Sequence, residues 1–231
     1  VSGTTKLWST GTLTLDGGSL ITGTFENSGT FRTTSGTNTI SGDVYNDGGF
    51  QVDSGSDLVL MDDVFGSGAF TGGGDVTFHG GFRPGNSPAT IEFGGDVLLD
   101  ATSSTFIEIG GQADAEFDRL VLSNIDAILK INDGAALDVQ LINGFELGFN
   151  QEFIFCNIAG SNLPVGTFSD LGEGDLVGSF SGTDLFISYA AGSGNDISLF
   201  TAVPEPSTFL VAAIALGALG TCRRPRKGIF A

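Results

Sequence analysis

The sequence has 231 residues with 27 acidic and nine basic side chains, for a formal net charge of −18. Of these, 26 acidic and five basic residues precede Val203, so this body carries −21. Such an acidic surface repels nucleic acid and anionic lipid, which excludes both as partners of the body. The 20 Phe residues supply enough apolar material for a core and argue against disorder.

Few residues of the chemically versatile types are present. The two cysteines, Cys156 and Cys222, cannot make a disulfide framework, and we expect Cys156 to be a small buried hydrophobe. The single histidine, His79, cannot assemble a histidine metal site or a catalytic triad. Stability must therefore come from packing or from ions, which suits a large repetitive β-fold.

The first third of the chain contains an internal repeat. The sequence opens at Val1 without Met or a secretory signal peptide, so we expect an N-terminal portion to be missing. Three segments share one template of a polar or Gly pair, Gly, a small residue and Phe: Asn27–Phe31, Asn46–Phe50 and Gly66–Phe70. Leu13 fits one step earlier. Short strands and Gly-rich turns at a period of about 20 residues predict a solenoid with stacked coils.

The fold class follows from this repeat. We expect an all-β protein, a right-handed parallel β-helix, with residues 1–80 forming coils in which Phe stacks on Phe. Asp and Asn next to Gly supply the corners between strands. An antiparallel sandwich, which also has short strands and turns, is the alternative architecture.

From Gly81 the pattern changes, and residues 81–201 are expected to form a C-terminal β-helix and cap region. A stiff turn at Pro84–Pro88 precedes a series of alternating strands that begins at Thr90–Phe93. The order of this turn, Ile107–Gly111, Phe117–Leu120 and the segment from Tyr189 resembles the C-terminal β-helix region of planctomycete-type PEP-CTERM proteins and autotransporter passengers. This resemblance implies a β-helix over about residues 82–200.

Three carboxylates are the strongest candidate ligands of the body. Asp114, Glu116 and Asp118 alternate, so an extended segment would place all three on one face. They are candidates for calcium or for a glycosidase pair, against the alternative of a solvated edge with Asp118 bonded to Arg119 or to backbone. We expect no other cofactor.

Two weaker patterns lie elsewhere in the body. The segment Gly192–Ile197 resembles one copy of a calcium-binding nonapeptide, although a plain turn before a strand with Ile197 and Leu199 inward and Ser198 outward is favoured. Threonine rows such as Thr12–Thr14 suggest a flat face for carbohydrate or ice, but they do not recur strictly.

The last 29 residues have the most specific pattern. A motif with two prolines precedes an apolar run and a basic cluster. This order resembles the PEP-CTERM sorting signal of Gram-negative bacteria that make extracellular polysaccharide. The resemblance assigns residues 202–231 to this signal, with the sorting motif at Val203, Pro204, Glu205, Pro206 and Ser207.

The apolar run predicts a hydrophobic helix that starts near Ser207 and enters the membrane. Its main apolar residues are Phe209, Leu210, Val211, Ile214, Leu216 and Leu219. Because the stretch is only about 20 Å long as a helix, it is a marginal span. The basic cluster of Arg223, Arg224, Arg226 and Lys227 is expected to stay in the cytoplasm, which leaves the body outside. A permanent transmembrane anchor and a buried helix of a soluble domain are the alternatives.

The resemblance implies an exosortase-type membrane protease as partner and a membrane-anchored precursor that is later displayed or released. We therefore expect an exported, non-enzymatic β-solenoid of the cell surface or extracellular matrix, with extracellular polysaccharide as a candidate partner. The alternatives are a calcium-dependent carbohydrate-binding adhesin and a polysaccharide-active β-helix enzyme.

Overall fold

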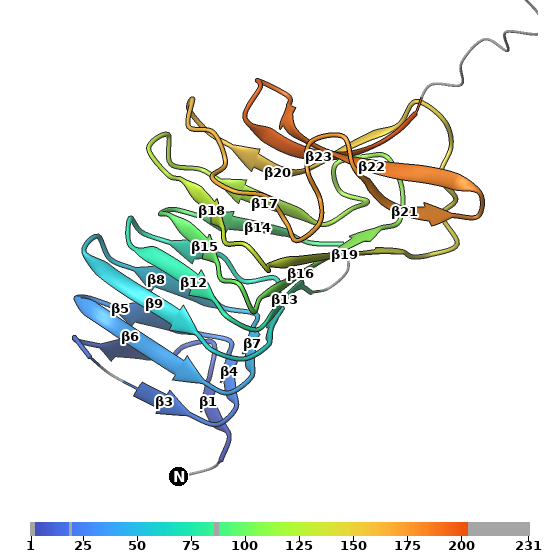
Figure 1. Ribbon diagram of the computed structural model, residues 1–231. Coiled ribbons are helices and arrows are strands. Elements are labelled where there is room, and N and C mark those ends of the chain that lie inside the picture. Colours follow the sequence, from blue (N-terminus) through green and yellow to red (C-terminus); the bar gives the residue numbers. More distant parts are fainter. Residues whose placement is uncertain (1–2, 19, 86–87, 203–231) are drawn as a thin grey trace, which may run out of the picture.

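The computed structural model describes residues 3–18, 20–85 and 88–202, and all regular elements in these ranges are strands. They form three sheets that run along the solenoid, and one of them continues to the C-terminal end (Figure 1). Sheet A contains β1 (Thr5–Leu7), β4 (Phe25–Asn27), β7 (Val44–Asn46), β10 (Val64–Gly66), β13 (Gly81–Pro84), β16 (Ser104–Ile109) and β19 (Ala136–Leu141). Sheet C contains β3 (Leu20–Thr22), β6 (Gly36–Ser41), β9 (Ser56–Leu60), β12 (Asp75–Phe78), β15 (Val97–Leu99) and β18 (Leu129–Ile131).

Sheet B is the longest and has two parts. Its parallel part contains β2 (Thr12–Leu15), β5 (Thr30–Thr33), β8 (Gly49–Val52), β11 (Phe70–Thr71), β14 (Thr90–Phe93), β17 (Arg119–Leu122) and β20 (Glu152–Ile158). Its antiparallel part continues with β23 (Asp196–Thr201), β22 (Thr183–Ala191) and β21 (Leu176–Phe180).

Consecutive strands go to sheets A, B and C in turn, and each pairs in parallel with the equivalent strand of the next coil. The chain therefore winds as a β-solenoid, which confirms the all-β solenoid prediction and excludes the antiparallel sandwich. Parallel pairing runs through the expected change at residue 81, since β10 pairs with β13 on one side and β13 with β16 on the other.

The predicted stack of phenylalanines is confirmed in the core. Leu13, Phe31, Phe50, Phe70 and Phe93 are successive register partners in sheet B. The Phe50 and Phe70 rings stack with centroids 5.2 Å apart and an interplanar angle of 8°. Each ring thus fills the space directly above the previous one, and all four Phe side chains are buried.

Close packing of successive coils explains why the repeated template contains Gly. A Cβ on Gly48 would lie 2.2 Å from the carbonyl oxygen of Gly29, and a Cβ on Gly68 would lie 2.1 Å from that of Gly48. Only glycine lets successive coils approach this closely at the corner before each stacked Phe.

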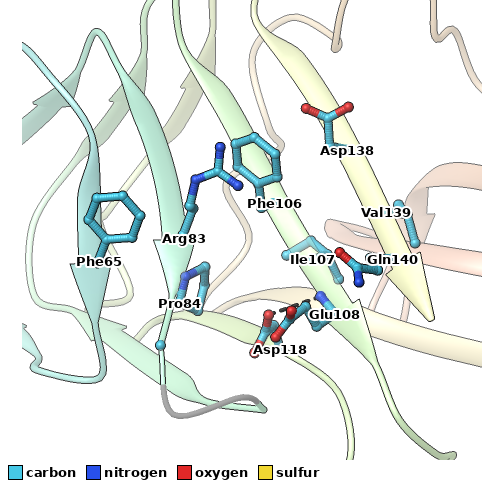
Figure 2. A pocket seen from close by; sticks show the side chains of 11 residues that line it. Phe65, Arg83, Pro84, Phe106, Ile107, Glu108, Asp118, Asp138, Val139 and Gln140 are labelled. Atoms are coloured by element: carbon cyan, nitrogen blue, oxygen red, sulfur yellow. Dashed lines mark hydrogen bonds between the residues drawn. The ribbon is translucent and has the colours of Figure 1, made fainter. Parts of the chain in front are cut away.

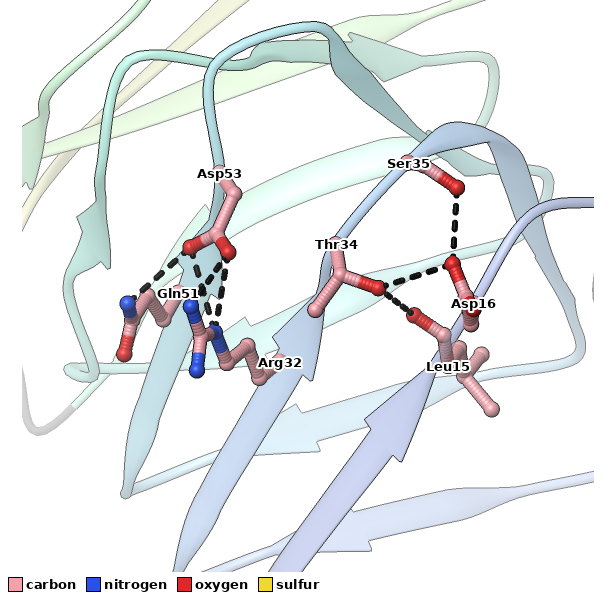
Figure 3. A network of polar contacts seen from close by, with 7 residues as sticks. All are labelled: Leu15, Asp16, Arg32, Thr34, Ser35, Gln51 and Asp53. Atoms are coloured by element: carbon pink, nitrogen blue, oxygen red, sulfur yellow. Dashed lines mark hydrogen bonds and ion pairs between the residues drawn. The ribbon is translucent and has the colours of Figure 1, made fainter.

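Polar side chains join neighbouring coils at their edges. Asp16 accepts hydrogen bonds from Thr34 and Ser35, and Asp53 accepts from Arg32 (Figure 3). These donors hold the pKa of both carboxyls below the usual range. Inside the stack, the amide of Asn27 donates to the Asn46 side chain at 2.8 Å.

The C-terminal end differs from the regular coils. Register partners in sheet B are 18 residues apart at Leu13 and Phe31 but 36 apart at Leu122 and Ile158, because the loops lengthen. There β23 pairs antiparallel with β20, so parallel stacking stops. We call β21, β22 and β23 the cap. The predicted C-terminal hydrophobic helix lies outside the described residues, and in the ranges described no helix is suited to crossing a membrane.

Candidate functional site

A hollow lies on the outer face of sheet A, near its C-terminal edge at β19 (Figure 2). We call it the sheet A cleft. Its volume is about 410 Å³, and apolar and polar side chains both line it. The residues that border it are Phe65, Arg83, Pro84, Gly85, Phe106, Ile107, Glu108, Asp118, Asp138, Val139 and Gln140.

An arginine held by aromatic rings forms one wall of the sheet A cleft. The guanidinium carbon of Arg83 lies 3.3 Å from the ring centroid of Phe106 and 6.0 Å from that of Phe65. Phe65 in turn stacks on Tyr45 with centroids 5.0 Å apart. A cation over a ring face is attracted by the ring quadrupole, so the aromatic row fixes the position of Arg83.

Alternate side chains of β16 and β19 form the other wall of the cleft. Phe106 pairs in register with Asp138, and Glu108 pairs with Gln140. Asp138 and Gln140 are exposed, whereas their neighbours on β19 are partly covered. The cleft opens because the outer face changes from the bulky Phe106 to the short Asp138 within one coil step.

Asp118 closes the floor of the cleft. Its side chain is 1% exposed and accepts hydrogen bonds from the backbone N–H groups of Ala89, at 2.8 Å, and Glu108, at 2.9 Å. Burial raises the pKa of Asp118 to about 6, against the lowering effect of these two donors. Oε2 of Glu108 is buried nearby and has no hydrogen-bond partner.

The three predicted carboxylates have separate partners. Residues 112–116 form bends and a turn, so the segment is not extended and does not place them on one face. Asp114 pairs with Arg119 at 2.8 Å, and Glu116 accepts from the N–H of Ala113. The backbone bonding expected of Asp118 is present, although Arg119 is not its partner. No group of three His, Cys, Asp or Glu suited to a metal occurs in the described ranges, and calcium binding stays a prediction.

The segment Gly192–Ile197 forms the turn before β23 with Ile197 and Leu199 buried, as predicted. The expected exposure of Ser198 is wrong, because β23 is buried on both faces and Ser198 donates to Glu152. Asn195 is buried and donates to the carbonyls of Ile158 and Asn162. These hydrogen bonds connect the turn before β23 to the end of β20 and the loop that follows it.

The remaining single residues have structural partners. His79 lies 2.9 Å from a carboxylate oxygen of Asp100. Cys156 is fully buried as predicted, and burial raises the pKa of its thiol. The sheet A cleft was not predicted, because Arg83, Phe106 and Asp138 are far apart in the sequence and meet only when three successive coils stack.

A β-solenoid with an adjoining sorting signal defines a protein that is exported and sorted to the cell envelope or surface. The signal is a PEP-CTERM protein-sorting motif, whose family model matches residues 202–227. Motifs of this kind are recognised by exosortase in the membrane. No curated protein matches the chain. The sorting residues, the apolar run and the basic cluster lie outside the described residues.

Proposed function

We propose that this protein is a structural and adhesive component of the cell surface or extracellular matrix, with a body that carries out no reaction. The observation on which this rests is the order of the parts. The solenoid ends with β23 at Thr201, and the sorting motif begins at residue 202. The signal that directs export is therefore attached directly to the capped end of a stacked scaffold.

The architecture supports a structural role. Each coil is bonded to the next along three sheets, and one column of the core repeats stacked Phe rings. Such stacking gives an elongated body with side chains at regular spacing on its outer faces. Its charge of −21 keeps copies apart unless a specific contact joins them.

The state of Asp118 supports a non-catalytic body. A general acid must reach its substrate, and a pKa raised toward neutrality is the usual sign of one. Asp118 has such a raised pKa, but it is 1% exposed and both its oxygens accept backbone hydrogen bonds. We therefore assign Asp118 a structural role, in which its buried carboxyl bonds the backbone N–H groups of Ala89 and Glu108.

The tail completes the proposal. A precursor is held in the membrane by its apolar segment, an exosortase-type protease cleaves near Pro204 to Pro206, and the body is displayed or released. The host is a bacterium with a Gram-negative envelope. The apolar run followed by four basic residues supports this route.

The test is intact-mass analysis of protein recovered from the outside of its host. The expected mass lacks the residues after the Pro204–Pro206 motif. Replacing Pro204, Glu205 and Pro206 together by Ala should leave an uncleaved, membrane-bound chain, while Pro164→Ala in a loop of the body should be processed normally. Surface protein that retains Arg223 to Ala231 contradicts the cleavage, and protein found only in the cytoplasm contradicts the proposed function.

A further inference from the structure

We propose that the sheet A cleft binds a segment of a neutral polysaccharide, with a sugar ring against Phe106 and its hydroxyls bonded to Arg83, Asp138 and Gln140. This inference rests on the proposed display outside the cell, and it names the ligand class. Its basis is the combination of a partly exposed aromatic ring and unpaired polar groups around one hollow (Figure 2).

The Phe106 ring offers the apolar contact. Arg83 lies over the ring at 3.3 Å from its centroid, and Asp138, the register partner on β19, has a side chain too short to fill the hollow beside the ring. The carbon face of a pyranose ring is apolar, so it packs well against an aromatic side chain. Burying such surface supplies affinity, and polar groups around it fix orientation.

The polar groups of the cleft match hydroxyl groups. Within the described part of the chain, the side chains of Asp138 and Gln140 make no hydrogen bond or ion pair. Oε2 of Glu108 is a buried acceptor without a partner. Among the residues that the structure describes, the one acidic partner of Arg83 is Asp63 at 4.0 Å, which leaves N–H groups of the guanidinium for a ligand. A sugar hydroxyl both donates and accepts, and it can satisfy donors and acceptors of this kind together.

Charge favours a neutral glycan. The cleft holds one guanidinium against the carboxyl groups of Asp138, Glu108 and Asp118, on a body with a net charge of −21. Uronate or sulfate groups would be repelled by this field. The same field attracts a cationic amino sugar to the body, but an ammonium group placed at the Phe106 wall would lie against Arg83, where like charges repel.

The aromatic row indicates a chain rather than a single sugar. Tyr45 is 44% exposed and stacks on Phe65, which borders the cleft one coil farther on. These rings extend the apolar surface along the solenoid axis, away from the hollow. A polysaccharide can therefore continue from Phe106 along the outer face of sheet A.

The experiment measures binding of the full chain, in mild detergent, to an oligosaccharide array. The array holds neutral oligomers of glucose, mannose, galactose and xylose, the anionic polygalacturonate and the cationic chitosan oligomers. We expect binding to at least one neutral oligomer. Phe106→Ala should raise its Kd about tenfold, and Gln140→Ala about fivefold.

The matched control is Phe186→Ala, since Phe186 is a partly exposed ring that packs on Phe200 in the cap. It should leave the Kd unchanged, and circular dichroism should show each variant folded. Binding only to charged glycans, binding to none, or equal effects of the Phe106 and Phe186 variants would overturn the inference. Export and cleavage are measured separately in the host. If a correctly displayed protein binds no glycan, the inferred ligand is wrong and the proposed function still stands.

Discussion

The regular coils and the cap are stabilised in different ways. In the coils from β4 to β12, parallel pairing stacks equivalent inner positions in columns, and one column repeats the same side chain at Phe31, Phe50 and Phe70. At the cap, pairing becomes antiparallel and a buried polar residue, Asn195, holds the turn before β23. Repetition thus builds the length of the solenoid, whereas a unique polar network ends it.

The largest expected effect is the loss of one ring from the stack. Phe50 is fully buried and contacts Phe31 and Phe70 above and below. Phe50→Ala should lower the free energy of unfolding by about 4 kcal/mol, because it removes apolar burial and leaves a cavity. Urea unfolding checks this. Phe186→Ala, at a partly exposed ring, should cost less than half as much, and equal losses would show that stacking is not the source of stability.

The second effect concerns pH and the floor of the sheet A cleft. Because the pKa of Asp118 is raised to about 6, the native state holds a proton that the unfolded state releases between about pH 4 and 6. Stability from this group is therefore greatest below that window and falls as pH rises through it, by about 3 kcal/mol in total.

Urea unfolding at a series of pH values measures this dependence. Asp118→Asn removes the titrating group, so the difference in unfolding free energy between wild type and variant should change by that amount across the window. A difference that stays constant with pH would contradict a buried, proton-holding carboxyl. The neighbouring exposed Gln112→Ala, which removes no titrating group, serves as the control and should leave the slope unchanged.

The third effect is specific to the cap. Asn195→Ala should cost about 2 kcal/mol, since the carbonyls of Ile158 and Asn162 lose a buried donor. Hydrogen exchange should accelerate in β21 to β23 while β4 to β9 stay protected. Asn132→Ala, which removes an exposed bond to Asp100, is the control and should change neither. Uniform acceleration would mean that coils and cap unfold as one unit.

The smallest effect is expected at the coil edge in Figure 3. Arg32 is paired with Asp53, and both side chains reach solvent. Arg32→Ala should shift the unfolding midpoint less than Asn195→Ala does, because solvent and salt screen an exposed pair. Repeating the measurement in 1 M salt should remove the shift, and a shift that persists would indicate lost packing instead.

The sequence predicts the coils well because their information is local and repeated. The Gly and Phe of each template lie a few residues apart, and their period predicts the stacked columns. The cap and the sheet A cleft depend on residues that meet only after the chain has wound several times. Arg83 contacts Phe106 of the next coil, and Asp118 accepts from Ala89 of the coil before, in coils longer than those of the first repeat, so neither contact follows its period of about 20 residues.

The prediction that the three carboxylates share one face failed because local alternation alone does not establish a strand. Alternation at Asp114, Glu116 and Asp118 predicts one face only if the segment is a strand, and residues 112–116 turn instead. Burial of Ser198 was missed for a related reason, since β23 is buried on both faces although its sequence alternates.

The position of β23 has a mechanical consequence. The chain passes from β23 directly toward the sorting motif, and β23 lies between β20 and β22 with hydrogen bonds to both. Tension on the C-terminus must therefore break two ladders at once, which resists far larger forces than peeling a strand from an edge. A body tethered or pulled by that end would transmit the force into the solenoid before its final strand came away.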